Sequence, residues 1–223
     1  MSPVAPPAAP RSLDELLTRA AALDGLRVGE LAQRLGLALP AAQRSAKGHI
    51  GRLLELALGA DAGSRDEPDF LALGVELKSI PLDKLGRVRE STFVCNLELG
   101  RAASAEWEGS RVRRKLACVL WVPVQSAPCA LPERHIGTPR LWRPSPPQEG
   151  LLRADWELLM GRIAAGGIDE LTARDGEALQ VRPKGRDGRV RAAGLGPDGE
   201  ALSVMPRGFY LRARFTESVL WQI

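Results

Sequence analysis

Three charged side chains in one short segment have the types and spacing that metal-assisted hydrolysis requires. Asp69 comes first, and Glu76 and Lys78 follow it, two residues apart. Residues 75–80 alternate in polarity with period two, which predicts a strand and places Glu76 and Lys78 on the same face. Asp69 lies at the start of the predicted hairpin, from which it can reach that face.

Two carboxylates held close together repel each other, and one of them takes up a proton unless a cation neutralises the pair. Mg²⁺ suits this role because it prefers oxygen ligands, keeps several waters and often shares them with phosphate. A metal-bound water is also a better nucleophile than bulk water. We therefore expect Asp69 and Glu76 to bind Mg²⁺, with Lys78 orienting the water or stabilising charge on a phosphorane-like transition state.

An alternative reading of the same residues is a solvated strand face that carries an ion pair. The bare pattern of Pro-Asp, a gap and Glu-x-Lys is loose and leaves both readings open. The apolar character of the surrounding residues 70–80 favours a functional site, because unpaired charges are costly to bury there. Glu55, on a predicted helix but off its apolar stripe, is by itself typical of a solvated glutamate.

Basic residues gather in two segments. Between Arg174 and Arg214 there are nine basic and five acidic residues, so this stretch alone carries an excess equal to the formal net charge of +4. A second run, Arg111–Lys115, holds four cations in five residues. Both fit a surface that faces phosphates, although a solvated basic face explains the charge equally well. Arg182, Lys184 and Arg207 stand beside Pro or Gly, and arginine and lysine suit the reading of guanine edges.

Composition indicates a soluble globular protein of 223 residues, with 44% hydrophobic and 26% charged residues. Its three cysteines have no close spacing and only two histidines accompany them, so a zinc site is not expected. Residues 1–11 are rich in Pro and Ala, without the basic and apolar regions of a signal peptide. With no apolar run able to span a bilayer, we expect a cytoplasmic protein with a disordered tail at 1–11 and a single two-lobed domain at 12–223.

Hydrophobic periodicity predicts a mixed α/β fold in which helices come early and strands cluster around a central sheet. Ser12 and Glu15 resemble a capping box at the start of the first helix. A Pro-rich connection is expected at 128–147, and a Gly- and Arg-rich loop joins the last two strands. Helices are expected at 13–21, 28–37, 49–58, 152–163 and 216–221, and strands at 75–80, 92–97, 118–124, 178–182 and 202–205.

Several blocks, in order along the chain, together resemble the MutH family of mismatch-repair endonucleases. The resemblance runs from about Leu13 to Phe215, and this chain of blocks is far more specific than the catalytic pattern alone. The blocks are residues 47–55, 58–60, 68–70, 74–78, 92–95, 113–116, 119–124, 182–184 and 206–211.

The resemblance implies a restriction-endonuclease-like fold, with a central sheet flanked by helices and two arms around a DNA cleft. It implies an enzyme that uses Mg²⁺ to nick the unmethylated strand of double-stranded DNA at hemimethylated GATC and is activated by MutL. Asp69 and Glu76 would be the metal ligands, Lys78 the catalytic lysine and Glu55 a further acidic residue of the site. The positions that match DNA or recognition residues of the family are Lys47, Phe93, Lys115, Arg182, Lys184 and Tyr210.

Two other functions are compatible with parts of this pattern. A restriction endonuclease of the same fold would cut both strands of GATC, but it usually needs two active sites, and no internal repeat is visible here. We therefore expect a monomer that nicks. A non-catalytic DNA-binding module would be expected to lack an acidic residue of the metal site, whereas Asp69, Glu76 and Lys78 are all present.

Overall fold

The computed structural model describes the backbone of most of the chain and divides it into two compact units. Unit 1 comprises Met1–Arg89 and Ala117–Arg143, and unit 2 comprises Glu90–Leu116 and Pro144–Ile223. Both units combine helices with strands, so the expected mixed α/β class is confirmed. The described residues are 5–40, 46–97, 105–126, 128–172, 174–184, 192–195, 201–204 and 206–221.

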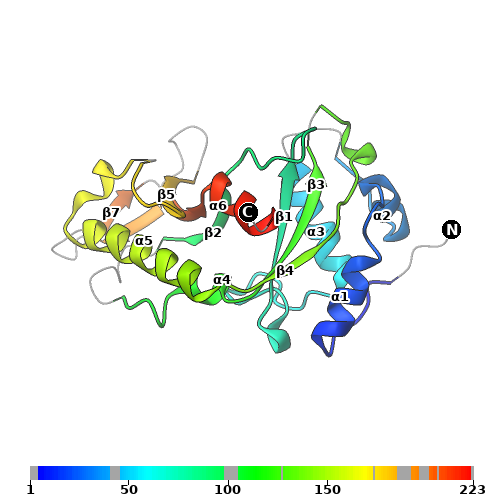
Figure 1. Ribbon diagram of the computed structural model, residues 1–223, viewed down its shortest axis with the longest axis horizontal. Coiled ribbons are helices and arrows are strands. Elements are labelled where there is room, and N and C mark those ends of the chain that lie inside the picture. The colour runs from blue at the N-terminus through cyan, green and yellow to red at the C-terminus, as the bar shows by residue number, and fades with distance from the viewer. Residues whose placement is uncertain are drawn as a thin grey trace. The chain divides into compact units, whose positions relative to one another are not determined.

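Unit 1 is built on a three-stranded sheet in the order β1-β3-β4, where β1 runs parallel to β3 and β4 runs antiparallel to it. Helices α1–α3 lie together on one side of β1 and β3 (Figure 1). The elements are α1 (Leu13–Ala21), α2 (Val28–Arg34), α3 (Ala46–Leu58), β1 (Glu76–Leu82), β3 (Val119–Gln125) and β4 (Arg140–Trp142), with short 3₁₀ turns at Leu71–Leu73 and Leu131–Glu133.

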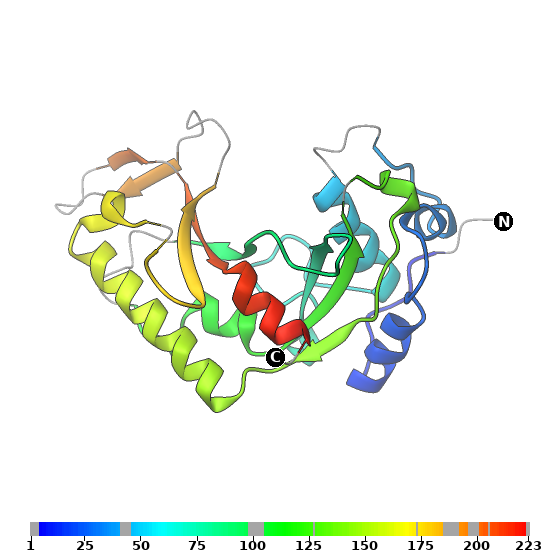
Figure 2. The same cartoon turned by 45° about the horizontal axis from the view of Figure 1, so that its top comes forward.

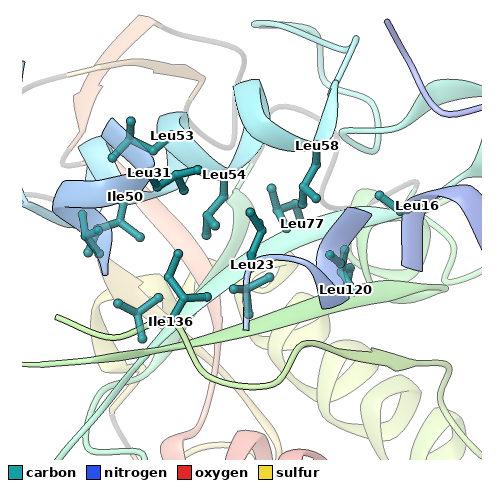
Figure 3. Packing of buried hydrophobic residues seen from close by; sticks show 14 of the residues in the cluster. Leu16, Leu23, Leu31, Ile50, Leu53, Leu54, Leu58, Leu77, Leu120 and Ile136 are labelled. Carbon is teal, nitrogen blue, oxygen red and sulfur yellow. The ribbon is translucent and has the colours of Figure 1, made fainter. Parts of the chain in front are cut away.

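The core of unit 1 lies between these helices and one face of the sheet. Alternation along the strands turns Leu77, Leu120 and Val122 toward the helices, where they meet the apolar stripes of α1 and α3. Figure 3 shows leucines of α1–α3, Leu77 and Leu120 packed in this core. Because the helices cover this face, the alternate residues Glu76 and Lys78 are left on the other face of β1.

Unit 2 is built on an antiparallel sheet in the order β2-β8-β5. The long helix α5 packs against β5, and α4 packs against β2; Figure 2 shows α5 beside the strands. The elements are β2 (Thr92–Asn96), α4 (Arg111–Leu116), α5 (Pro146–Ala164), a 3₁₀ turn (Gly167–Glu170), β5 (Leu179–Pro183), β8 (Arg207–Leu211) and α6 (Ala213–Trp221). Strands β6 (Ala192–Leu195) and β7 (Ala201–Val204) form a separate antiparallel pair.

A buried carboxylate connects α5 to the start of β5. Asp155 is 6% exposed, and its oxygens accept hydrogen bonds from the backbone N–H groups of Glu177, Ala178 and Leu179 at 2.6–2.9 Å. Ionised acceptors make stronger hydrogen bonds than neutral ones, so this contact holds the first residues of β5 firmly against α5. The Asp155 hydrogen bonds thereby fix the start of β5, the strand that carries Arg182.

The expected elements differ from the observed ones in informative places. Ser12 does cap α1, accepting from the Glu15 N–H at 3.1 Å, but the Glu15 carboxylate accepts from Arg11 instead of completing a capping box. Instead of one central sheet, the described strands form two three-stranded sheets and one pair. Elements absent from the expectation are β4, within the Pro-rich connection, together with α4, β6 and β8.

Part of the segment expected to be a disordered tail makes contacts with unit 1. The Arg19 guanidinium donates to the Ala8 carbonyl at 2.7 Å, and Pro10 is buried. Residues 1–4 lie outside the described residues, as do Arg186, Arg189 and Arg191 of the basic stretch and most of the loop expected between the last strands. In the part of the chain that the structure describes, no helix is long and apolar enough to cross a membrane.

Candidate active site and DNA interface

Glu76 and Lys78 form a largely buried ion pair on β1. The Lys78 Nζ lies 2.6 Å from the Glu76 Oε1, and the two side chains are 15% and 4% exposed, respectively. The expectation that they share one face of a strand is confirmed, since residues two apart on a strand project to the same side. The pair lies across from β3, where Lys78 is level with Trp121. An ion pair this shielded is screened little by salt.

Asp69 reaches β1 because the chain folds back on itself immediately before the strand. Phe70 and Val75 exchange backbone hydrogen bonds across a turn that Gly74 closes with a φ of +61°. This turn brings the Asp69 Oδ2 to 2.7 Å from the Leu77 N–H, on the strand edge that faces away from β3. The Asp69 carboxylate therefore lies beside the backbone between Glu76 and Lys78.

The donor set on β1 fits Mg²⁺. It consists of carboxylate oxygens, which are the ligands that this cation prefers, and Mg²⁺ in phosphate-handling sites is often held by only one or two carboxylates with water and phosphate supplying the rest. Within the described residues, no group of three or more His, Cys, Asp or Glu side chains is arranged to hold a metal. Asp69 and Glu76, the two ligands that the sequence predicts, are the carboxylates that could hold the cation here.

Glu55 lies near the end of α3, the helix that packs on β1 from the core side. Its backbone carbonyl accepts from Gly59 and Ala60 and so closes the helix. The same loop continues to Asp61 and Ala62, whose N–H groups donate to the Asp69 carbonyl. Glu55 and Asp69 are thus connected through a hydrogen-bonded loop, but in the described chain Glu55 does not join the two carboxylates in a three-membered metal group.

Of the two predicted lysines, one has no described side chain and the other belongs to unit 2. Lys47 belongs to α3, but its side chain is outside the described part of the structure. Lys115 lies in unit 2, on the inner side of α4, and is 9% exposed. The run Arg111–Lys115 is thus a short helix, in which Arg113 bonds to Glu149 at 2.9 Å while Arg114 is exposed.

In unit 2, one face of the sheet carries two aromatic rings in contact. Phe93 of β2 is level with Tyr210 of β8, and their ring centroids lie 5.3 Å apart in an edge-to-face arrangement. Gly208 makes room for Phe93, because a Cβ at that position would lie 2.8 Å from a carbon of the ring. The Tyr210 ring is partly buried, and burial raises the pKa of its hydroxyl.

Two cations lie over these rings. The Arg182 Cζ is 6.0 Å from the Tyr210 ring centroid, and the Lys184 Nζ is 4.7 Å from that of Phe93. Both distances are within the range of cation–π attraction. Phe93, Arg182, Lys184 and Tyr210 thus come together in one group, which we call the aromatic–cation cluster.

Arg207 does not join this cluster. Alternation along β8 places Arg207 and Tyr210 on opposite faces of the sheet. The Arg207 guanidinium donates to the Asp169 carboxylate at 2.6 Å, and its side chain is 14% exposed. Arg207 and Tyr210 are close in the sequence but separate in the sheet. The role of Arg207 in DNA binding stays a prediction.

Comparison with known proteins decides the family. Residues 58–155 match the family model described as the DNA mismatch repair enzyme MutH. The chain is 47% identical over 212 residues to the DNA mismatch repair protein MutH of Haemophilus influenzae strain PittGG, with 95% of each chain covered. It is 48% identical over 213 residues to the MutH protein of Vibrio cholerae strain M66-2, covering 95% of this chain and 96% of the relative.

The chain belongs to the MutH family.

A third MutH protein, from Shewanella woodyi, is 46% identical over 215 residues, covering 96% of this chain and 93% of the relative. Similarity to MutH proteins therefore covers nearly the whole chain and extends through both units. As a member of the MutH family, the chain is a DNA mismatch repair endonuclease, and the family implies a restriction-endonuclease-like fold. The resemblance stated from the sequence is confirmed.

Proposed function

We propose that this MutH-family chain uses Mg²⁺ to nick the unmethylated strand of hemimethylated GATC and that MutL activates it. The observation that carries the proposal is the buried Glu76–Lys78 pair with the Asp69 carboxylate held at the adjacent edge of β1. Charged groups in such a shielded position usually have a strong partner or a function. A hydrolytic centre made of two carboxylates and a lysine would be that function.

Asp69 and Glu76 would hold the cation. When bound, Mg²⁺ supplies an activated water and neutralises charge on the phosphate. The Leu77 N–H fixes one Asp69 oxygen, so the carboxylate is oriented before any ligand arrives. The Glu76 carboxylate is likewise held by Lys78, which limits the reorganisation needed on binding.

Lys78 would act on the reacting phosphate. Its ammonium is held within 2.6 Å of Glu76, so it stays close to whatever that carboxylate binds. A cation at this place stabilises the negative charge that develops on phosphate oxygens as water attacks. Glu55 would be an additional acidic residue of the site, acting from the end of α3.

The aromatic–cation cluster of unit 2 would contact DNA. Arg182 and Lys184 are exposed cations on one sheet face, beside two rings, and such side chains can pair with guanine edges while rings contact bases. Lys47, Lys115 and Arg207 would add further DNA contacts. In this proposal the catalytic strand and the cluster belong to different units.

Tyr210 would sense the methyl state of adenine. Methylation at N6 removes one donor hydrogen and adds bulk in the major groove, where adenine shows an N7 acceptor and an N6 donor. The Tyr210 ring is held between Phe93 and Arg182, so a base with added bulk would meet a side chain that cannot easily move aside. Discrimination by such a contact is about 1–3 kcal/mol.

The deciding experiment uses duplexes with one GATC that are unmethylated, hemimethylated on either strand or fully methylated. Each strand carries a different fluorophore, and products are resolved on denaturing gels in the presence of Mg²⁺ with and without MutL. We expect nicks only in unmethylated strands and a higher rate with MutL. Efficient double-strand cutting without MutL by a stable dimer would instead indicate a restriction endonuclease.

A variant links the methyl response to its residue. We expect Tyr210→Ser to lose strand bias on hemimethylated duplexes more than total activity on unmethylated DNA. Tyr210→Phe, which keeps the ring, is the matched control and should retain most of the steric bias. Full bias in Tyr210→Ser, or a protein that no longer folds, would assign Tyr210 a structural role.

The free protein would act as a cytoplasmic monomer. Cys118 and Cys129 carry free thiols, as is usual in a reducing compartment. One set of catalytic groups per chain suits a single nick. Sedimentation of the purified protein tests the oligomeric state directly.

A further inference from the structure

Ser91 connects a buried amide of unit 2 to an exposed arginine. The Ser91 Oγ accepts from the Gln180 Nε2 at 2.8 Å and from the Arg182 Nη1 at 3.2 Å. Gln180 is 4% exposed and lies level with Tyr210 in the sheet, so it forms part of the fixed interior. Through Ser91, the guanidinium of Arg182 is tied to that interior although the side chain itself is exposed.

Asn96 does the same for the second cation. Its Oδ1 accepts from the Lys184 Nζ at 2.7 Å, while that ammonium lies 4.7 Å from the Phe93 ring centroid. The backbone of Lys184 is fixed as well, since its N–H donates to the Pro206 carbonyl at 2.7 Å. Backbone, side-chain oxygen and ring therefore restrict Lys184 from three directions.

These contacts affect what the two cations can recognise. Long basic side chains lose rotamer freedom when they bind, and a side chain that is already held in place loses less. A cation that swings freely can satisfy phosphates in many positions, whereas a held cation favours only the base edge that lies in front of it. Anchoring should thus increase sequence discrimination more than total affinity.

We propose that Ser91 and Asn96 are positioning residues, which hold Arg182 and Lys184 over the Tyr210 and Phe93 rings and thereby set the sequence specificity of DNA binding. This rests on the proposed function, in which Arg182 and Lys184 contact DNA. Neither Ser91 nor Asn96 needs to touch a base. Each acts through the cation that it holds.

The test measures binding of the full chain to two labelled duplexes by fluorescence anisotropy in Ca²⁺ without Mg²⁺. One duplex contains GATC and the other differs from it by one base pair. The ratio is the dissociation constant of the altered duplex divided by that of the GATC duplex. It should fall by about 5- to 10-fold in Ser91→Ala and in Asn96→Ala, which is part of the discrimination expected of one base contact. Affinity for the altered duplex should change little.

Conservative variants and a control separate positioning from folding. Ser91→Thr keeps a hydroxyl and should keep the wild-type ratio, and Asn96→Asp keeps an accepting oxygen and should keep the ratio while weakening binding to both duplexes. Ser218→Ala removes a serine of α6 whose hydroxyl donates to the Phe215 carbonyl, and it should change binding to neither duplex. Melting temperatures identify variants that lose their fold.

The outcomes are distinguishable. If the wild-type protein shows no preference for GATC, the proposed function fails. If the wild type prefers GATC and both alanine variants keep its ratio, or weaken both duplexes equally, the positioning role is overturned. If Ser91→Ala fails to fold because Gln180 loses its partner, Asn96→Ala decides, since Asn96 is exposed. The ratio of dissociation constants must then fall in Asn96→Ala for the proposal to stand.

Discussion

The Nζ of Lys78 lies 2.6 Å from the Oε1 of Glu76, and the two residues form a shielded ion pair on one face of β1. This pair connects the chemistry of the site to its stability, because removing either charge leaves the other in a poorly solvated position. Variants of Glu76 or Lys78 should therefore differ from the wild type in stability as well as in activity.

Loss of any one charge should stop nicking while DNA binding survives. We expect Asp69→Ala, Glu76→Ala and Lys78→Ala to reduce nicking of a GATC duplex below detection and to change the dissociation constant for that duplex only slightly. The reason is that, in the proposed function, these three residues bind the metal and stabilise the phosphate, whereas the predicted DNA contacts are spread over other elements. Glu67→Ala, which alters an exposed acidic residue of the preceding loop, is the control. Near wild-type nicking by one of the three variants would remove that residue from the site.

Mg²⁺ should stabilise the wild-type fold in the absence of DNA. Any ligand that binds only the folded state stabilises it, by about 2.7 kcal/mol at a concentration one hundred times its dissociation constant. We expect the melting temperature to rise with Mg²⁺ in the wild type and not in Glu76→Gln. In Lys78→Met the rise should be larger than in the wild type, because the buried Glu76 carboxylate has lost the ammonium that lies beside it in the wild-type fold. Equal shifts in all three proteins would place the metal elsewhere.

DNA binding should depend strongly on salt. Each phosphate contact contributes about −0.9 to the slope of log affinity against log salt. Lys184→Ala should make the slope shallower by about 1 if Lys184 also contacts a phosphate in the complex. Arg34→Ala, in which an exposed cation of α2 is lost, should leave it unchanged. A wild-type slope near zero would exclude the basic stretches from the interface.

Tyr210 can be titrated without interference because it is the only tyrosine in the chain. Burial raises the pKa of its hydroxyl, and the nearby Arg182 guanidinium partly opposes that rise. The midpoint of the phenolate absorbance should therefore lie above 10 in the folded protein and near 10 in denaturant. Because folding favours the neutral phenol, its contribution to stability is complete below pH 10 and is lost as the pH rises through the folded pKa.

The Arg182→Ala variant provides the control for that titration. Removing the guanidinium removes the influence that lowers the pKa, so the midpoint should move further up. A midpoint in the folded wild type at or below that of the denatured chain would contradict the observed burial of the ring.

Asp155 should be critical for the stability of unit 2. Its carboxylate accepts from three consecutive backbone N–H groups, so Asp155→Ala should destabilise the unit by roughly 3 kcal/mol. Glu157→Gln, on the same helix, breaks only an exposed pair with Arg153 and should cost about 0.5 kcal/mol or less. Thermal unfolding followed by circular dichroism compares the two. Equal losses would show that the Asp155 hydrogen bonds add little.

Recognition also depends on what surrounds the predicted residues. The sequence indicates Phe93, Arg182, Lys184 and Tyr210 as recognition residues but not Ser91, Asn96 or Gly208. A serine, an asparagine and a glycine have no sequence pattern that marks them as anchors or as space for a ring. Their contacts join β2 to β5 and β8, so only the paired sheet reveals them.

The sequence by itself determined the chemical groups, their local spacing and the family. Period-two alternation is a local property of the backbone, so it was sufficient to place Glu76 and Lys78 on one face of a strand. Helix α1, helix α3 and residues 152–163 of α5 were likewise predictable, because each buries an apolar stripe set by its own residues. The ordered blocks identified the MutH family before any contact was known.

Only the tertiary structure decided which distant groups meet. The turn at Gly74 brings Asp69 to the Leu77 N–H, and sheet pairing brings Phe93 to Tyr210. Pairing also explains β4 and β8, whose Pro-, Gly- and Arg-containing surroundings carry weak strand signals but whose backbones complete a sheet. Arg207 and Tyr210 lie on opposite faces of β8, a separation that follows from alternation once sheet pairing establishes this weakly marked segment as a strand.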